Sequence, residues 1–376
     1  MEMHASDEFS LSFDYASGIT AERFQNPLWR ITEIFIGSKF RRSVAVVKNF
    51  GRRIVASAVK DRNEPSSKHE TGSPPDEDSK LDDISGSLIQ SLLDALGNEE
   101  TVADAALTYL SAGRDTTGQA LTWAFYLLLQ HPSAVSKIRA EVQHLLCSQP
   151  QQQQPQQPQQ PPSSPIIDTR LFTPHALPYT TAVFHEALRL FPPIPFEIRQ
   201  CQADTALPDG TLLPRGAVLV WCLWAMQRAR EIWGGDAGVF RPERFLVDGG
   251  DVRDGGGGGG GGSGGGGEGK GSGERRGGEG GGESESGEVG GVARKKFVLG
   301  KTAAEFPVFY GGARACLGKK MAEAIAVQVI PAVVWGFDVE KGWDGPMEGR
   351  RSQTSLTLPM EGGLPVKVRV RVGGVE

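Results

Sequence analysis

Cysteine is scarce in this sequence: only four of the 376 residues are cysteines, at positions 147, 201, 222 and 316. They are widely spaced and form no C-x-x-C pair, which argues against a zinc site or a disulfide framework and favours a reducing compartment. Long apolar runs are also missing, since no window reaches about 18 uninterrupted apolar residues, and no signal peptide opens the chain. We therefore expect no membrane span. Basic charge is not in excess, and the net charge of −5 gives no reason to expect nucleic acid as a partner.

Two segments have a strongly biased composition. Residues 149–165 consist almost wholly of Gln, Pro and Ser, and residues 249–291 are dominated by Gly. Neither can bury enough apolar surface to offset the entropy lost on ordering, so we predict both to be disordered insertions. The glycine-rich segment lacks a G-x-x-x-x-G-K-[ST] pattern, which argues against a phosphate-binding loop. Because the insertions interrupt the chain without dividing it, we expect residues 1–376 to form a single domain.

Spacing of apolar residues predicts the secondary structure. Residues three or four apart share a helix face, whereas alternation is typical of a strand. Proline marks several boundaries: His131-Pro132 ends a long helix, and Ser133 is expected to cap the next one. A polar stretch over residues 61–83 is predicted to be a loop. The predicted helices cover residues 40–59, 102–130, 133–146, 178–190 and 322–337, and the predicted strands cover residues 217–222, 355–358 and 366–372. The fold class is therefore mainly α with small β-sheets.

Cys316 stands in the most informative segment, Phe309-Tyr310-Gly311-Gly312-Ala313-Arg314-Ala315-Cys316-Leu317-Gly318. A nearby arginine and a glycine-rich backbone favour the thiolate, which is the form of cysteine that binds metals. The helix predicted just after it adds a dipole that stabilises negative charge. A buried structural cysteine is the alternative interpretation.

Three further motifs precede this loop, in a fixed order. They are Ala112-Gly113-Arg114-Asp115-Thr116-Thr117 within the long helix, Glu186-Ala187-Leu188-Arg189, and Phe240-Arg241-Pro242-Glu243-Arg244-Phe245. Asp115 lies in an apolar helical run, where a carboxylate is costly unless it is paired, solvated or functional. Glu186 and Arg189 are three positions apart on a helix, so they share a face and can pair.

The four motifs together resemble those of the cytochrome P-450 haem-thiolate monooxygenases. The resemblance implies the cytochrome P-450 fold, haem b as cofactor and Cys316 as the axial ligand of its iron, because a thiolate ligand favours O–O cleavage. It implies that Asp115 and Thr116 are catalytic and deliver protons during dioxygen activation. It also implies that Glu186, Arg189 and Arg244 form a buried structural charge cluster. The haem-binding residues that it implies are Arg314, Arg199, Phe309, Gly312, Gly318, Ala112 and Gly113.

Arg314 and Arg199 are expected to pair with the haem propionates, because guanidinium geometry suits carboxylates. An ordinary surface arginine remains the alternative for Arg199. In the same motif segment Thr117 is expected to bond back to the helix carbonyls and to bend the helix locally. Ala313 stands where the family usually has proline, and Tyr310 where asparagine is common.

Several runs are similar to plant-type fatty-acid ω-hydroxylases, including residues 112–123, 185–195 and 356–366; residues 13–62 resemble the segment over their substrate cavity. This similarity implies a long-chain fatty acid as substrate, hydroxylated at its terminal carbon with O2. Electrons would come from NADPH through a flavoprotein reductase. Full-length members lie on the cytosolic face of the endoplasmic reticulum membrane, whereas this chain, with no anchor, is expected to be cytosolic or peripheral.

The long helix begins near residue 100, earlier than in the family, so we expect an N-terminally incomplete domain. Three hypotheses follow from this observation. The chain is an incompletely represented monooxygenase, a haem-binding fragment without activity, or a non-enzymatic remnant that acts as an interaction protein.

Overall fold

The computed structural model describes residues 2–63, 88–148, 168–248, 295–353 and 355–371. The insertions predicted at 149–165 and 249–291 lie outside these residues, and so does most of the polar stretch 61–83. Residues 61–63 of that stretch are the end of a helix rather than a loop. The prediction of disorder and the prediction of a single domain therefore stay predictions.

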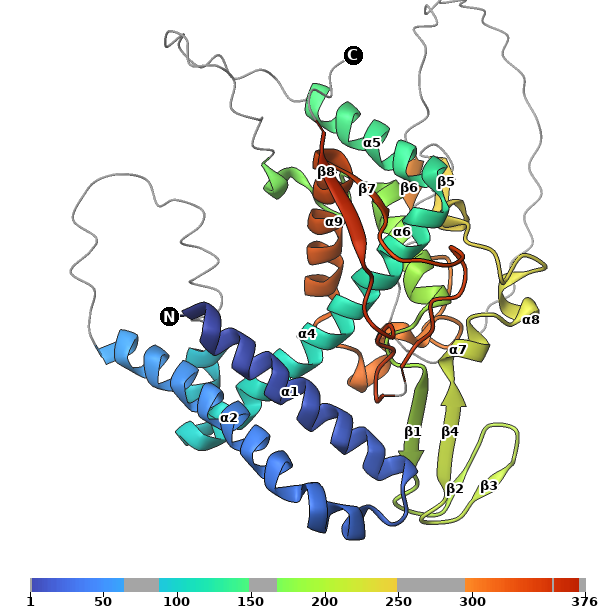
Figure 1. The fold of residues 1–376 in the computed structure, drawn as a ribbon. Coiled ribbons are helices and arrows are strands. Elements are labelled where there is room, and N and C mark those ends of the chain that lie inside the picture. Colours follow the sequence, from blue (N-terminus) through green and yellow to red (C-terminus); the bar gives the residue numbers. More distant parts are fainter. Residues whose placement is uncertain (1, 64–87, 149–167, 249–294, 354, 372–376) are drawn as a thin grey trace, which may run out of the picture.

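Helices make up most of the described chain (Figure 1). The helices predicted at 102–130, 133–146, 178–190 and 322–337 are confirmed within about three residues, whereas α1 (Glu2–Gln25) was not predicted and α2 (Trp29–Asn63) extends well beyond the predicted residues 40–59 at its N-terminal end. The long helix begins three residues earlier than predicted, because the side chain of Asn98 caps it by accepting a hydrogen bond from the backbone N–H of Thr101 at 2.9 Å. The longer helices are α1 (Glu2–Gln25), α2 (Trp29–Asn63), α4 (Glu99–Gln130), α5 (Pro132–Cys147), α6 (Pro178–Leu190) and α9 (Lys319–Gly336). Short helices are η1 (Thr169–Leu171), α7 (Leu223–Met226), α8 (Arg230–Trp233), η2 (Pro242–Phe245), η3 (Pro307–Phe309) and η4 (Gly312–Arg314).

The start of α5 corrects one prediction. Ser133 is not the cap; the helix begins at Pro132, and His131 occupies the cap position without a side-chain cap hydrogen bond. Proline suits the first helical position because its fixed φ matches the helix and its missing N–H has no partner to lose there. The next helix, α6, covers the predicted residues 178–190 without change.

The described strands form four two-stranded antiparallel sheets. The predicted strands at 217–222 and 366–372 are confirmed in slightly shorter form, as β4 and β8, whereas the strand predicted at 355–358 is wrong. There the backbone N–H of Leu358 donates to Gln119 Oε1 at 2.9 Å, and the Leu358 carbonyl accepts a hydrogen bond from Trp123 Nε1 at 2.8 Å. The backbone groups of Leu358 that would pair with a neighbouring strand are therefore bonded to side chains of α4. The strands are β1 (Phe196–Gln200), β2 (Thr205–Ala206), β3 (Leu212–Leu213), β4 (Val218–Cys222), β5 (Leu246–Asp248), β6 (Lys295–Phe297), β7 (Phe337–Lys341) and β8 (Val366–Val370). The predicted fold class, mainly α with small β-sheets, is thus confirmed.

The main core lies where α4, α5, α6 and α9 meet. Every residue from Thr180 to Leu190 is buried, so α6 is enclosed by its neighbours on all sides. A helix that is buried all round is expected to be apolar, yet α6 carries buried polar and charged side chains. These need partners within the core, and two of them belong to the predicted charge cluster.

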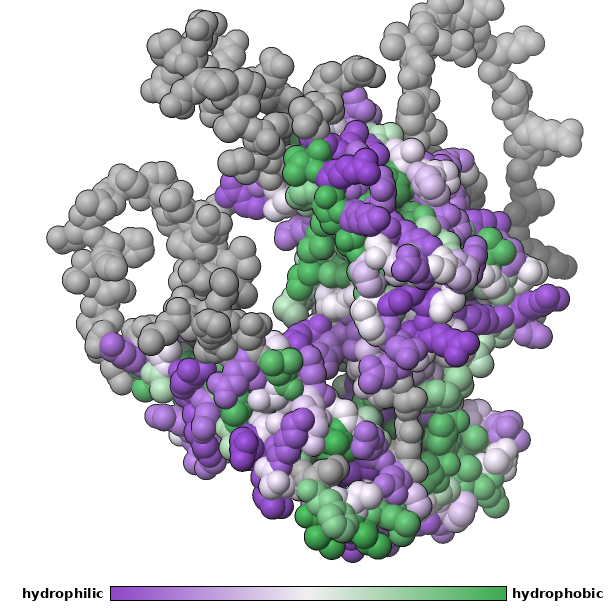
Figure 2. All heavy atoms as spheres, viewed as in Figure 1, coloured by the Kyte–Doolittle hydropathy of each residue, from purple (hydrophilic) through white to green (hydrophobic). Residues whose placement is uncertain are grey.

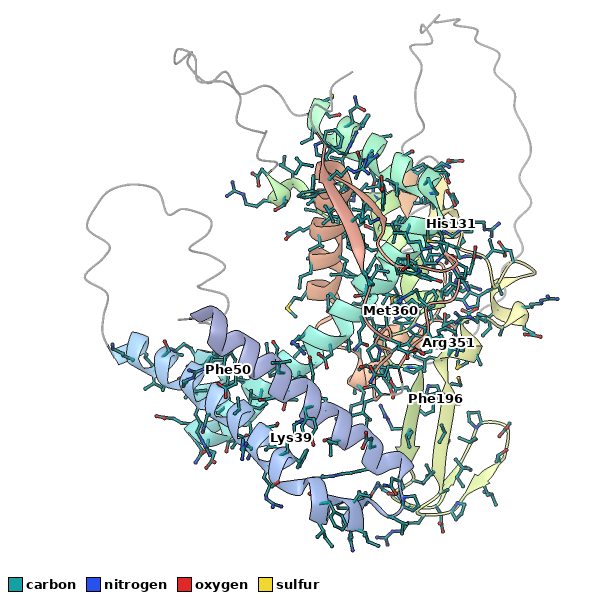
Figure 3. All side chains as sticks on the ribbon, in the orientation of Figure 1. Lys39, Phe50, His131, Phe196, Arg351 and Met360 are labelled. Atoms are coloured by element: carbon teal, nitrogen blue, oxygen red, sulfur yellow. The ribbon has the colours of Figure 1, made fainter. Side chains whose placement is uncertain are left out.

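Helices α1 and α2 form an antiparallel pair that packs on the N-terminal part of α4 (Figures 1 and 3). Phe50 of α2 stacks on Phe9 of α1, with ring centroids 4.2 Å apart. Gly51 allows α2 to approach α4 closely, because a Cβ at this position would lie only 2.7 Å from Leu107 Cγ. Within the described residues, none of the helices combines the length and the apolar character that crossing a bilayer requires.

The β1–β4 sheet has two unlike faces. Ile198 and Val220 are opposite each other in the register, and together with Phe196 and Val218 they leave one apolar face exposed. This face contributes to the hydrophobic surface over β1 and β4 in Figure 2. The alternate residues Glu197, Arg199, Leu219 and Trp221 point to the other face, which carries the polar groups considered below.

Glu141 of α5 links this helix to the start of α6. Its carboxylate accepts hydrogen bonds from the backbone N–H groups of Tyr179 at 2.6 Å and Thr180 at 2.9 Å, and from the Thr180 hydroxyl at 2.7 Å. Burial raises the pKa of Glu141, and the three hydrogen bonds only partly oppose this shift. The folded chain therefore holds a proton on Glu141 more tightly than the unfolded chain does.

This shift predicts how stability depends on pH. Between the unfolded and folded pKa values the folded chain binds more protons, so the contribution of Glu141 to the free energy of unfolding falls as pH rises. We expect the difference in free energy of unfolding, unaltered chain minus Glu141→Gln, to decrease as pH rises from about 4 and to level off above the folded-state pKa. Urea unfolding at a series of pH values measures this difference. A difference that increased with pH would contradict the prediction.

Candidate functional site

The cysteine loop runs from η3 through η4 to the start of α9. The backbone N–H of Cys316 donates to the carbonyl of Phe309 at 2.8 Å, so the loop closes on itself just before the helix. Gly318 occupies the N-cap position of α9, and Cys316 is exposed. The thiol thus lies just before the N-terminal end of an 18-residue helix, and a Cβ on Gly318 would lie 3.9 Å from Cys316 Sγ.

Glycines make the tight path of this loop possible. Gly312 has φ +64°, a left-handed conformation that a side chain would strain. A Cβ on Gly311 would lie 2.7 Å from Ala303 Cβ, so a side chain there would clash with the segment that precedes the loop. The backbone path of the loop therefore favours glycine at both of these positions.

The second motif lies on α4, opposite the first turn of α9. A Cβ on Gly113 would lie 3.4 Å from Met321 Cε, which places Ala112 and Gly113 near the helix that follows the cysteine. Thr116 Oγ1 donates to the carbonyl of Ala112 at 2.6 Å. The back-bonding hydroxyl is thus that of Thr116, whereas the sequence had suggested Thr117, which is buried.

Asp115 is engaged in a small ionic network that joins α4 to α1. Arg114 Nη1 donates to Asp115 Oδ1 and to Asp14 Oδ1, both at 2.8 Å. Burial raises the pKa of Asp115, and the charge of Asp14 acts in the same direction, while Arg114 opposes both. Sequence reasoning missed Asp14, because its distance of 100 residues from Arg114 leaves no local signal.

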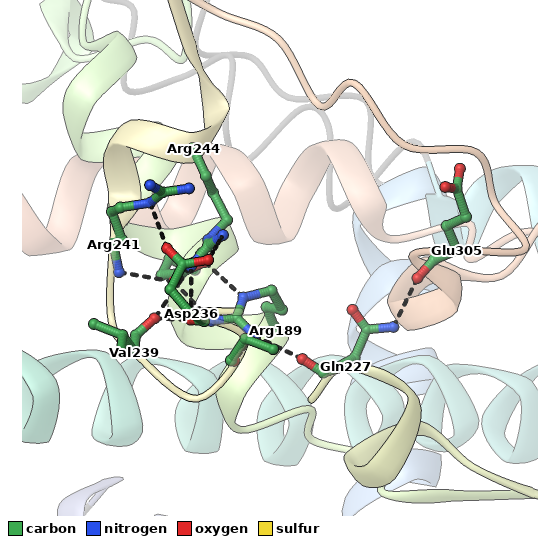
Figure 4. Close-up of polar contacts among 9 residues, drawn as sticks. Arg189, Gln227, Asp236, Val239, Arg241, Arg244 and Glu305 are labelled. Carbon is green, nitrogen blue, oxygen red and sulfur yellow. Dashed lines mark hydrogen bonds and ion pairs between the residues drawn. The ribbon is translucent and has the colours of Figure 1, made fainter. Parts of the chain in front are cut away.

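The predicted charge cluster forms around α6, which carries Glu186 and Arg189 (Figure 4). Arg189 Nε and Nη2 each donate to a Glu186 carboxylate oxygen at 2.8 Å, and both side chains are fully buried. Arg189 also donates to the backbone carbonyls of Gln227, Ala237 and Val239. All three nitrogens of this guanidinium therefore donate to protein oxygens.

Arg244 completes the cluster from η2. Its Nε lies 3.1 Å from both oxygens of Glu186, and its side chain is 6% exposed. Asp236 lies 3.4 Å from Arg244 Nη2 and 2.9 Å from Arg241 Nε, and it adds a second carboxylate that sequence reasoning missed. The cluster fixes the segment 234–245 against α6, which is consistent with a structural task.

Arg199 reaches the cysteine loop from β1. Its guanidinium carbon lies 4.9 Å from the ring centre of Tyr310 and 5.9 Å from that of Trp221. Its Nη1 donates to the carbonyl of Ile198 at 2.8 Å and lies 3.7 Å from Glu197 Oε2. Burial raises the pKa of Glu197, although Arg199 opposes this shift. Arg199 is therefore more than an isolated surface arginine.

Arg314, by contrast, is exposed and has no hydrogen-bond or ion-pair partner among the described residues. The residues proposed from the sequence thus form three groups. The loop holds Phe309, Gly312, Arg314, Cys316 and Gly318, with Arg199 beside it; α4 holds Ala112, Gly113, Asp115 and Thr116; and the charge cluster holds Glu186, Arg189 and Arg244.

Comparison with known proteins gives consistent results. The family model for cytochrome P450 matches residues 18–255, which include the α4 motif and the charge cluster but not Cys316. Cytochrome P450 94A1 of Vicia sativa is 27% identical over 97% of this chain and 57% of its own length. Cytochrome P450 monooxygenase cyp1 of Mycosarcoma maydis is 30% identical over 97% of this chain and 49% of its own length. Cytochrome P450 94C1 of Arabidopsis thaliana is 26% identical over 97% of this chain and 59% of its own length. The chain spans about half to three fifths of the length of these curated relatives.

Proposed function

The chain belongs to the cytochrome P450 family, and from this premise we propose that it is a haem-thiolate monooxygenase that inserts one atom of O2 into a C–H bond. The observation that carries the proposal is the exposed thiol of Cys316. It lies just before α9 in a loop closed by the hydrogen bond between Cys316 and Phe309. A thiol so placed is accessible to a ligand.

The described residues fit a haem. The exposed thiol of Cys316 would bind the iron, and Arg314, which has no partner among the described residues, and the half-exposed Arg199 would bind the two carboxylates of the haem. On the resemblance, the small residues Ala112 and Gly113 of α4 would lie beside the group; a Cβ on Gly113 would lie 3.4 Å from Met321 Cε in the first turn of α9. When bound, the haem supplies an iron that binds oxygen, with a thiolate ligand that favours O–O cleavage.

We assign proton delivery to Asp115 and Thr116. Arg114 holds Asp115 through Oδ1, so Oδ2 is the oxygen that carries a proton. The raised pKa of Asp115 keeps its proton available nearer to neutral pH than an ordinary carboxyl would. Thr116 uses its own proton in the bond to Ala112, so its oxygen lone pairs are free to accept a hydrogen bond.

Terminal hydroxylation of a long-chain fatty acid is the finer proposal. It rests on the resemblance of residues 13–62 and 356–366 to ω-hydroxylases. A cavity of about 180 Å³ between these two segments supports it. The lining is mostly apolar, with Phe13, Phe40, Val44, Val47 and Leu356, as an acyl chain requires. On the same resemblance we propose an NADPH-dependent flavoprotein reductase as electron donor and the cytosolic face of the endoplasmic reticulum membrane as location.

One experiment separates this proposal from the alternatives of an inactive haem-binding fragment and a non-enzymatic remnant. Residues 1–376 are expressed, supplied with haem and reduced, and the carbon monoxide difference spectrum is recorded. A strongly red-shifted Soret band reports thiolate ligation, and fatty-acid turnover with a reductase is then assayed. The band without turnover favours the inactive fragment; no band at all favours the remnant.

Replacing Thr116 by alanine is expected to uncouple oxygen consumption from hydroxylation. A positioned proton-transfer group contributes about 10²–10⁴-fold to a rate, so we expect hydroxylated product to fall on the order of 100-fold while oxygen is still consumed. Product formed per O2 consumed measures the effect. The matched control is Thr108→Ala on the same helix, because the Thr108 hydroxyl bonds back to the carbonyl of Asp104 in the same way. Unchanged coupling in Thr116→Ala would show that the proton path lies elsewhere.

A further inference from the structure

Tyr310 combines two unfavourable features within the cysteine loop. Among the residues that the structure describes, it is the one non-glycine residue with positive φ, and its φ of 57° with ψ of −174° belongs to a region that glycine almost alone adopts. Its hydroxyl is also buried without a hydrogen-bond partner. A buried polar group without a partner is costly, and such strain typically occurs at functional sites.

The surroundings of Tyr310 show what kind of partner is missing. The Arg199 guanidinium lies over its ring, and of its nitrogens only Nη1 donates a hydrogen bond within the described chain. A guanidinium has five N–H donors, and a phenol has one O–H donor. Two side chains with unused donors are therefore in contact through the Tyr310 ring, and this favours an acceptor that carries negative charge.

The carboxylate that pairs with Arg199 does not fill this role. Glu197 Oε2 is 3.7 Å from Arg199 Nη1, beyond an ordinary hydrogen bond, and it makes no hydrogen bond to Tyr310. Trp221 packs against Tyr310 with ring centroids 6.5 Å apart and offers only an N–H donor. The acceptor is therefore expected to come from a ligand.

The position of Tyr310 in the chain identifies the ligand. Phe309, its neighbour, accepts the hydrogen bond from the Cys316 N–H, so Tyr310 is fixed to the loop that carries the thiol. A ligand that binds the thiol carries a metal. A ligand that also accepts hydrogen bonds from Tyr310 and Arg199 carries an anionic group such as a carboxylate. We propose, on the basis of the proposed function, that the Tyr310 hydroxyl donates a hydrogen bond to the haem carboxylate that Arg199 also binds. Tyr310 is then a haem-binding residue that this chain has in place of the asparagine common in the family.

Tyr310→Phe isolates the hydroxyl, because phenylalanine keeps the ring that contacts Arg199 and Trp221. A hydrogen bond to a charged acceptor is worth about tenfold or more in an equilibrium constant. We expect the variant to lose haem about tenfold faster to an excess of an apoglobin, measured on residues 1–376 loaded with haem. With haem dimethyl ester, whose carboxylates are uncharged, the variant and the unaltered chain should lose the group at similar rates. The control is Tyr109→Phe, on an exposed tyrosine of α4.

The stability of the haem-free chain provides a second measurement. Removing a buried hydroxyl without a partner should leave the urea midpoint of the haem-free chain unchanged or higher, whereas the haem-loaded chain should become less stable. The assignment of Tyr310 would be overturned, with the proposed function left standing, by either of two results. One is that the variant and the unaltered chain lose haem at the same rate; the other is that the substitution speeds the loss of the dimethyl ester as much as the loss of haem. Failure of the unaltered chain to give the red-shifted carbon monoxide band would overturn the proposed function, and this assignment with it.

Discussion

Replacing Cys316 by alanine is expected to abolish the red-shifted carbon monoxide band and all hydroxylation. The alanine methyl group cannot bind iron, so the variant has no thiolate at this position to give the band. The loop itself should persist, because its closing hydrogen bond to Phe309 uses the backbone N–H of residue 316. The carbon monoxide difference spectrum of the reduced, haem-loaded variant measures the loss.

Cys147→Ala is the matched control for this experiment. Cys147 is also an exposed thiol, but it is the last residue of α5, whereas Cys316 lies just before the start of α9. The control should keep the band and the activity of the unaltered chain. A red-shifted band that survived in Cys316→Ala would remove the central claim about this site.

Replacing Glu186 by glutamine is expected to lower the free energy of unfolding by about 3–5 kcal/mol. Glu186 is the shared carboxylate of two guanidinium groups, and its side chain and that of Arg189 are fully buried. Glutamine has nearly the same shape but carries no charge, so Arg189 would lose its counter-charge and Arg244 would keep only Asp236. Removing one partner of a buried ion pair is far more costly than replacing all of them together. Urea unfolding of the full chain at neutral pH measures the loss.

Glu340→Gln serves as the control for the charge cluster. Glu340 pairs with Arg369 at 3.4 Å on the β7–β8 sheet, and the two side chains are 52% and 73% exposed. Solvent screens such a pair, so we expect a change within about 0.5 kcal/mol. Equal effects of the two substitutions would mean that the buried cluster does not hold the segment 234–245 in place.

Local patterns predicted α4, α5, α6 and α9 well, because the determinants of these helices are local; they missed α1 and the first eleven residues of α2. Pro178 and Pro192 delimit α6, and Asn98 caps α4 through a residue three positions away. The spacing of Glu186 and Arg189 was enough to place them together on one helix face. Arg244 was expected only from the resemblance, and Asp236 was missed, because both reach Glu186 or its partners from a segment that is about 50 residues further along the chain.

The incorrect predictions concern residues whose contacts lie far along the chain or depend on side-chain orientation, which local patterns do not show. The strand predicted at 355–358 has a suitable composition, yet its backbone groups bond to Gln119 and Trp123, which no local pattern could indicate. The back-bonding hydroxyl was expected at Thr117 and is observed at Thr116, because which hydroxyl bonds to a helix carbonyl depends on side-chain rotation. The missing partner of the Tyr310 hydroxyl was equally hidden, since it depends on the meeting of β1, β4 and the cysteine loop.

The hydrogen bonds between α4 and the segment around Leu358 affect how the chain folds during its synthesis. Gln119 and Trp123 bond to residues 235 to 239 positions further on, so these contacts cannot form until nearly the whole chain has left the ribosome. Until then Trp123, which is almost fully buried in the finished protein, has no cover from Leu358 and Met360. Loop closure over such a distance slows folding, and nascent chains expose apolar surface in the meantime. A premature stop after β7 would therefore leave the central helix without the cover that completes its folding.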